Sequence, residues 1–102
     1  MNIAFNMMMN YIPVHNALKV RKNGEFLIAS NRNCEIYYLN EIAGEMWNII
    51  DGHKTVEDVC NKIFSEYNVE RGKLESDVVN FIRDMQWKKL IRLKISKSKQ
   101  EG

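Results

Sequence analysis

The chain has 102 residues, of which 45% are hydrophobic, and its formal net charge is +2. This length predicts one domain with one core, and it leaves no room for a deep catalytic cavity beside that core. The small net charge excludes a protein that attracts polyanions through its overall charge. Two cysteines without metal or redox spacing, and no recognisable signal peptide, predict a cytoplasmic protein.

The first residues, MNIAFNMMMNYI, are apolar but too few to span a membrane. We therefore expect no membrane partner and interpret residues 1–12 as a flexible apolar arm that ends at Pro13. Residues 13–95 then form the domain. Residues 96–102, SKSKQEG, are polar and are expected to be a disordered basic tail.

Three predicted strands follow the arm. Residues 17–22 alternate apolar and basic side chains, which is typical of a strand with one wet face. Asn23-Gly24 is a strong hairpin signal and leads into a partner strand over residues 25–30. Asn31-Arg32-Asn33 predicts a second turn, and residues 34–39 form the third strand. The three strands predict an antiparallel meander.

Three helices are predicted after the meander. Asn40 is expected to cap a helix over residues 41–51, and Thr55 with Asp58 has the spacing of a capping box for the next. A third helix covers residues 73–88, and residues 90–95 alternate like a short final strand. The predicted fold class is α+β and winged-helix-like, with a three-stranded antiparallel meander followed by three α-helices.

The sequence offers no set of converging catalytic groups. His15 precedes the first strand and His53 lies in a turn between helices. Cys34 and Cys60 are interpreted as small core residues, with a thiol function at Cys34 kept as an alternative. We therefore predict a binding protein rather than an enzyme, with no catalytic residue, no metal and no cofactor.

A winged helix suggests nucleic acid as one partner. The second helix, however, exposes a net acidic face, and the third exposes mixed charges, which would repel duplex DNA. The counter-evidence is the stretch over residues 83–99, which holds seven Lys or Arg against one acid. A small winged-helix nucleic-acid-binding regulator is therefore the alternative function, and nucleic acid is the less favoured partner.

A sheet edge is the other candidate surface. Residues 35–39, EIYYL, contain no Lys, Arg or Pro, the residues that usually protect an exposed edge. An unprotected strand beside an amphipathic helix is suited to accept a peptide as an added strand. The same pattern also fits a central strand that is paired on both sides, and the residues alone do not choose between the two.

An ordered series of short motifs resembles the PqqD family, the small peptide-recognition domains known as RiPP recognition elements. The series covers most of the chain, from residue 12 to residue 93. Its members are Pro13, Gly24-Glu25, Leu39-Asn40, Ala43 and Trp47, Asp51-Gly52, Thr55-Val56, Tyr67, Asp77-Val78 and Phe81-Ile82. The chain departs from the family at Lys89, where members often carry Gly before the final apolar pair.

The resemblance implies a peptide chaperone without catalytic activity. Family members bind the leader segment of a ribosomally made precursor peptide and present it to a modifying enzyme, often a radical S-adenosylmethionine (SAM) enzyme. The leader adds to the third strand and lies against the third helix. Carried onto this chain, the peptide-binding residues are Glu35, Ile36, Tyr37, Tyr38, Leu39, Leu74, Asp77, Val78, Phe81, Ile82, Met85 and Lys88.

Some of these assignments remain divided between groove and core. Phe81 and Met85 are expected to serve both, whereas Ala43 and Trp47 are assigned to the core. Lys88 with Lys89 would attract an acidic leader. The open strand edge also makes a homodimer possible.

Overall fold

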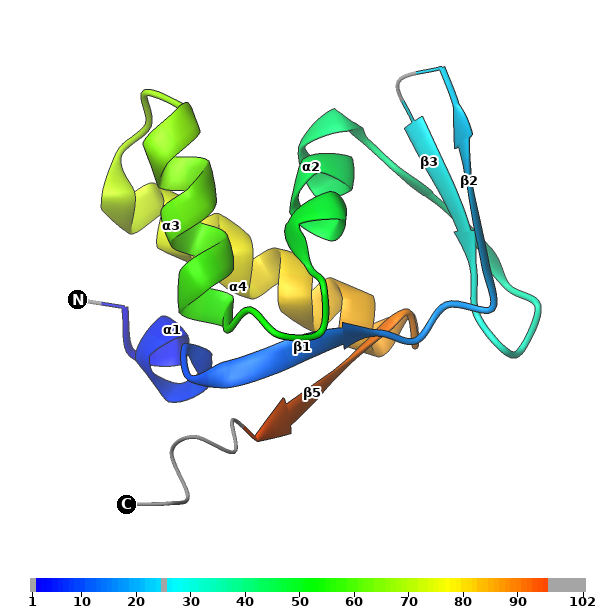
Figure 1. Cartoon of the computed structure of the whole chain (residues 1–102), viewed down its shortest axis with the longest axis horizontal. Coiled ribbons are helices and arrows are strands. Elements are labelled where there is room, and N and C mark those ends of the chain that lie inside the picture. Colours follow the sequence, from blue (N-terminus) through cyan, green and yellow to red (C-terminus); the bar gives the residue numbers. More distant parts are fainter. Residues whose placement is uncertain (1, 25, 96–102) are drawn as a thin grey trace.

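The computed structural model describes residues 2–24 and 26–95. The predicted α+β class with a three-stranded meander is confirmed, and the described residues add a short first helix and a second sheet (Figure 1). In chain order the elements are α1 (Ile3–Met8), β1 (Tyr11–His15), β2 (Lys19–Asn23), β3 (Phe26–Ser30), β4 (Ile36–Leu39), α2 (Glu41–Ile49), α3 (Val56–Glu66), α4 (Arg71–Trp87) and β5 (Ile91–Ile95).

The start of the chain differs from the flexible arm expected over residues 1–12. Asn2 caps α1 by accepting a hydrogen bond from the Phe5 amide, and Phe5 and Met8 are buried. Pro13 does not end an arm but lies inside β1, which pairs antiparallel with β5. A strand with one neighbour tolerates Pro because the missing N–H can face away from the partner. The predicted tail over residues 96–102 lies outside the described residues.

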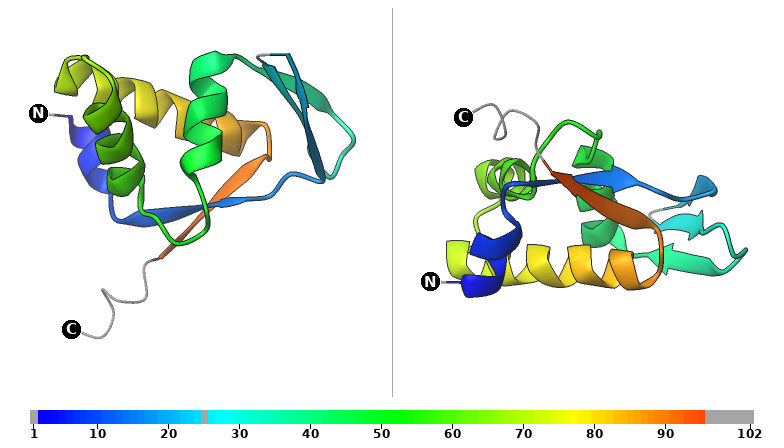
Figure 2. Two further views of the ribbon diagram at one scale, coloured as in Figure 1. Left: turned by 45° about the horizontal axis from the view of Figure 1, so that its top comes forward. Right: turned by 90° about the horizontal axis from the view of Figure 1, so that it is seen from below.

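The meander has the order β2-β3-β4, with both pairs antiparallel. The Asn23-Gly24 signal is confirmed, since Asn23 pairs with Phe26 and Gly24 has a φ of +63°. In Figures 1 and 2 the meander projects from one end of the helical body, beside α2. β4, the last strand of the meander, is shorter than predicted and begins at Ile36, because residues 31–35 form a hydrogen-bonded turn.

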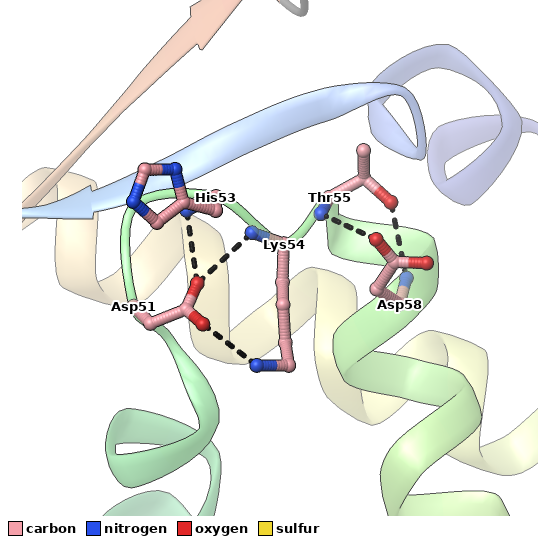
Figure 3. A network of polar contacts seen from close by, with 5 residues as sticks. All are labelled: Asp51, His53, Lys54, Thr55 and Asp58. Atoms are coloured by element: carbon pink, nitrogen blue, oxygen red, sulfur yellow. Dashed lines mark hydrogen bonds and ion pairs between the residues drawn. The ribbon is translucent and has the colours of Figure 1, made fainter.

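The helices pack into one core beside the meander. Asn40 caps α2 as predicted, by accepting from the Ala43 amide at 2.9 Å. The predicted capping box of α3 is also present: the Thr55 hydroxyl accepts from the Asp58 amide, and the Asp58 carboxylate accepts from the Thr55 amide (Figure 3). The third predicted helix, α4, begins two residues earlier than expected, at Arg71.

Two contacts fix α2 to its neighbours. The His15 ring of β1 stacks on the Trp47 ring with centroids 4.1 Å apart, and His15 Nε2 lies 2.9 Å from the Trp47 carbonyl oxygen. Three residues earlier in α2, Gly44 lies against Leu27 of β3. The meander and the β1–β5 sheet are therefore both held to the same short helix.

Candidate functional site

The third strand of the meander is its edge strand. β4 pairs with β3, and the sheet order places no described strand on its other side. Alternate residues of an edge strand point backbone N–H and C=O groups away from the sheet. The opposite edge, β2, carries Lys19, Arg21 and Lys22, all exposed, whereas β4 carries no basic residue. The sequence left the position of this strand open, and the structure resolves it in favour of the edge.

The side chains of β4 divide between two faces. Ile36 and Tyr38 are 62% and 68% exposed on the outer face of the sheet. Leu39 points into the core, and Tyr37 is half-buried on the same side. The Lys88 ammonium at the end of α4 lies 5.1 Å from the centroid of the Tyr37 ring. The end of α4 is therefore brought beside the first half of β4.

A hollow opens between α2 and α4, immediately after the end of β4. Its volume is about 360 Å³, enough for a large side chain. Methionine, phenylalanine and aliphatic side chains supply its apolar part, and amides and carboxylates supply its polar part. The lining residues are Asn40, Ile42, Ala43, Met46, Asp77, Asn80, Phe81, Asp84 and Met85. Together with the free edge of β4, this hollow forms the candidate peptide site.

The structure separates the predicted α4 residues into two groups. Leu74, Val78 and Ile82 are buried in the core and do not line the hollow. Phe81 and Met85 belong to the core and also line the hollow, as the sequence led us to expect of these two. Helical spacing explains the two groups, because residues three or four positions apart lie on the same face of a helix. The core group and the hollow group occupy adjoining faces of α4.

The charged residues at the hollow are carboxylates that already have lysine partners. Asp77 lines the hollow and lies 3.6 Å from the Lys73 ammonium. Asp84 lines it further along and pairs with Lys88 at 2.9 Å. Both are exposed pairs between residues four apart, which contribute little to stability and can exchange partners.

Sequence reasoning missed much of the α2 side of this hollow. Ala43 was assigned to the core, and it packs against the core as a half-buried residue but also lines the hollow, whereas Trp47 is buried as expected. Ile42 and Asn80 also line it and carried no predicted role. The residue that could have marked this side of the hollow is Ile42, a large apolar side chain that α2 leaves exposed.

Sequence reasoning also missed Asn31, the buried residue that joins β4 to α4. Its side-chain amide donates to the Lys88 carbonyl at 2.8 Å and to the Glu35 carboxylate at 2.6 Å. Its side-chain oxygen accepts from the amides of Asn33 and Glu35. The backbone N–H and C=O of Glu35 are both bonded to Asn31, so Glu35 lies outside the free edge to which the sequence assigned it.

The residues considered for catalysis do not converge. Cys34 is exposed in the turn before β4 rather than in the core, and its φ is +67°. Cys60 is buried as predicted, and burial raises the pKa of its thiol. Within residues 2–24 and 26–95, no cluster of three metal-ligating side chains occurs. Over the same residues, no helix is long and apolar enough to cross a membrane.

Comparisons with known proteins agree with this geometry. The family model described as "Coenzyme PQQ synthesis protein D (PqqD)" matches residues 25–91. A search of curated protein sequences found no match. Two solved structures share the fold. The first is TbiB1 in complex with the TbiA(beta) leader peptide, with a TM-score of 0.69 and 20% identity over 78% of this chain and 93% of that one.

The second is a lasso peptide synthetase B1 complexed with the leader peptide, with a TM-score of 0.67 and 19% identity over 81% of this chain and 98% of that one. At these identities, the two structures establish likeness of fold. The family model covers most of the chain, from the second strand of the meander to the start of β5. The chain belongs to the PqqD family.

Proposed function

We propose that this protein binds the leader segment of a ribosomally synthesised precursor peptide by strand addition. The observation that carries the proposal is the free, unprotected edge of β4, which leads directly into the hollow between α2 and α4. Both structural neighbours were solved with leader peptides, and family membership gives the same direction. No finding supports the alternative of a nucleic-acid-binding regulator.

The two parts of the site have different tasks. Residues 36–39 supply backbone hydrogen bonds, which grip an extended peptide with little dependence on its sequence. The hollow accepts one apolar side chain of the leader against Phe81, Met85 and Ala43, and this contact supplies selectivity. Asp77 and Lys88 border the site and contribute polar contacts. Because a flexible leader must be ordered on binding, we expect a Kd of about 1 μM, roughly −8 kcal/mol.

The protein itself performs no chemistry in this proposal. It presents the bound leader to a modifying enzyme in the cytoplasm, and a radical SAM enzyme is the class of partner that family membership favours. No cofactor is required, because the partner carries out the reaction. Cys34→Ser is therefore expected to leave leader binding unchanged, whereas a thiol function would be lost with it.

Filling the hollow tests the proposal without disturbing the sheet. In Ala43→Phe, the larger side chain occupies the space meant for the leader, so we expect at least about tenfold weaker binding. The ligand is the leader of a candidate precursor peptide, sought among short open reading frames near the gene of this chain, and Kd is measured by fluorescence anisotropy.

The matched control is the next residue of the same helix. A Cβ added at Gly44 would meet Leu27 side-chain atoms at 3.6 Å, an ordinary contact on the side away from the hollow. Gly44→Ala should bind the leader like wild type, and it should be about 0.5–1 kcal/mol more stable because alanine favours the helix. Equal affinity for wild type, Ala43→Phe and Gly44→Ala would contradict the proposed site.

A further inference from the structure

Another hollow lies where β4 begins, at the opposite end of the strand from the first. Its volume is about 430 Å³, and we call it the basic cleft. Segments far apart in the sequence meet there: the loop after β1, the turn before β4, the end of α4 and the start of β5. The polar lining consists of Arg32, Lys89 and Arg92 with the amides of Asn16, Asn33 and Gln86.

The charges of the basic cleft are all of one sign. Its lining holds three cationic side chains and no carboxylate. Within residues 2–24 and 26–95, neither Arg32 nor Lys89 nor Arg92 forms a salt bridge, whereas Lys88 is paired with Asp84. Arginine and lysine beside side-chain amides form a set of donors suited to a carboxylate. The cleft therefore matches an acidic ligand.

Lys89 occupies a backbone position that favours glycine. Its φ is +61°, in the left-handed region, where the Cβ of an ordinary residue is strained by about 1 kcal/mol. The position ends α4, since the Lys89 amide donates to the Gln86 carbonyl and the Leu90 amide donates to the Met85 carbonyl. Glycine would satisfy the same turn without strain. Lys89 therefore carries a backbone cost at a position where its side chain lines the basic cleft.

The two hollows flank the same free edge. Arg32 and Asn33 precede β4, whereas Asn40 and Ile42 follow it. β4 has four residues, and an extended strand of that length spans about 13 Å. A peptide lying along the edge, with one side chain in the first hollow, therefore comes near the basic cleft within a few residues.

We propose that the basic cleft binds acidic residues of the precursor peptide, a few residues along from the segment that adds to β4. This inference rests on the proposed function and assigns a second contact to the same ligand. Binding then requires a pattern in the peptide: an apolar anchor for the hollow and carboxylates at a fixed distance from it. The Lys89 contact weakens with rising salt, because the cleft is open to solvent.

The test selects ligands from a displayed library of random peptides of about sixteen residues, with the 102-residue chain as bait. We expect selected peptides to carry Asp or Glu at a constant spacing from an apolar residue. Lys89→Asn tolerates the left-handed backbone but removes the charge, and it should weaken binding of these peptides about fivefold. Lys89→Arg should restore affinity. Lys62→Asn, which removes a cation from α3, is the control and should change nothing.

A double-mutant cycle shows whether the contact is direct. Replacing the peptide's Asp or Glu by the amide should abolish the effect of Lys89→Asn. If peptides are selected without acidic residues and Lys89→Asn binds them normally, while Ala43→Phe does not bind, the basic cleft proposal is overturned and the proposed function stands. The basic cleft proposal is also overturned if inorganic phosphate or duplex DNA binds in the cleft more tightly than the selected peptides do. If no peptide is selected, both proposals fail.

Discussion

At the scale of single residues, Asn31 is the side chain that holds the peptide site together. It is fully buried, and its side-chain amide makes four hydrogen bonds, one to the Lys88 carbonyl just after α4 and three to Asn33 and Glu35 in the turn before β4. The edge and the helix that flank the site are therefore positioned by one buried polar group. Such a group stabilises only while all its partners are satisfied.

Asn31→Ala should lower the free energy of unfolding by about 3 kcal/mol, because it removes the hydrogen bonds that a fully buried side chain makes to the Lys88 carbonyl and the Glu35 amide. Urea unfolding measures the loss. Asn33→Ala, an exposed neighbour in the same turn, is the control and should change stability by less than about 0.5 kcal/mol. Similar small losses for both variants would show that the buried network is not what orders this turn.

A charged turn around Asp51 links α2 to α3. The Asp51 carboxylate accepts from the Lys54 ammonium at 2.7 Å and from the amides of His53 and Lys54 (Figure 3). The Lys54 hydrogen bond, aided by the His53 amide, holds the pKa of Asp51 well below its usual range. The folded state therefore favours the ionised form of Asp51. The carboxylate stabilises the folded state above about pH 4, and this stabilisation is lost as the pH falls further.

Wild type should accordingly be more stable than Asp51→Asn near pH 7, and the difference should shrink below about pH 4. Thermal unfolding midpoints of the two proteins, compared from about pH 7 to about pH 2, provide the measurement. A constant difference across this range would contradict the role of the ionised carboxylate.

At the scale of elements, α1 is the part of the fold that sequence reasoning misjudged most. It packs against α4, the Met9 carbonyl accepts from the Glu57 amide at 3.0 Å, and Arg71 of α4 lies over the Phe5 ring. The start of the chain thus packs against the first turns of α4, the helix whose later residues line the candidate peptide hollow. It is a structural element rather than an arm.

Phe5→Ala should cost about 3 kcal/mol of stability, because the ring is 2% exposed and its removal leaves a cavity. Met7 is 75% exposed on the same helix, so Met7→Ala should be close to neutral. Chemical denaturation of both variants measures the contrast. If Phe5→Ala is as mild as Met7→Ala, the chain start is dispensable, as expected of a flexible arm.

At the scale of the whole molecule, the sequence predicted local features well because local chemistry determines them. Asn40, the Thr55–Asp58 box and the Asn23-Gly24 turn each act within a few residues, and all three occur as predicted. Phe81 and Met85 of α4, which the family resemblance led us to expect at both core and groove, pack in the core and line the hollow.

Features that depend on distant partners were not predicted. β1 is recognisable only by its pairing with β5, some eighty residues later in the chain. The role of Asn31 is recognisable only by its hydrogen bond to the distant Lys88 carbonyl. Whether β4 was central or at the edge depended likewise on which strands lie beside it. Its exposure, the property on which the proposed function depends, therefore required the three-dimensional arrangement.

Amide NMR titration of the 102-residue chain with the leader of a candidate precursor peptide tests binding by strand addition. We predict that shift changes concentrate at Ile36–Leu39 and at the α2 and α4 residues that line the hollow, with α3 unaffected. New protection of β4 amides from solvent exchange would accompany them, because strand addition gives those groups partners. The absence of changes along β4, or changes confined to other surfaces, would contradict binding by strand addition.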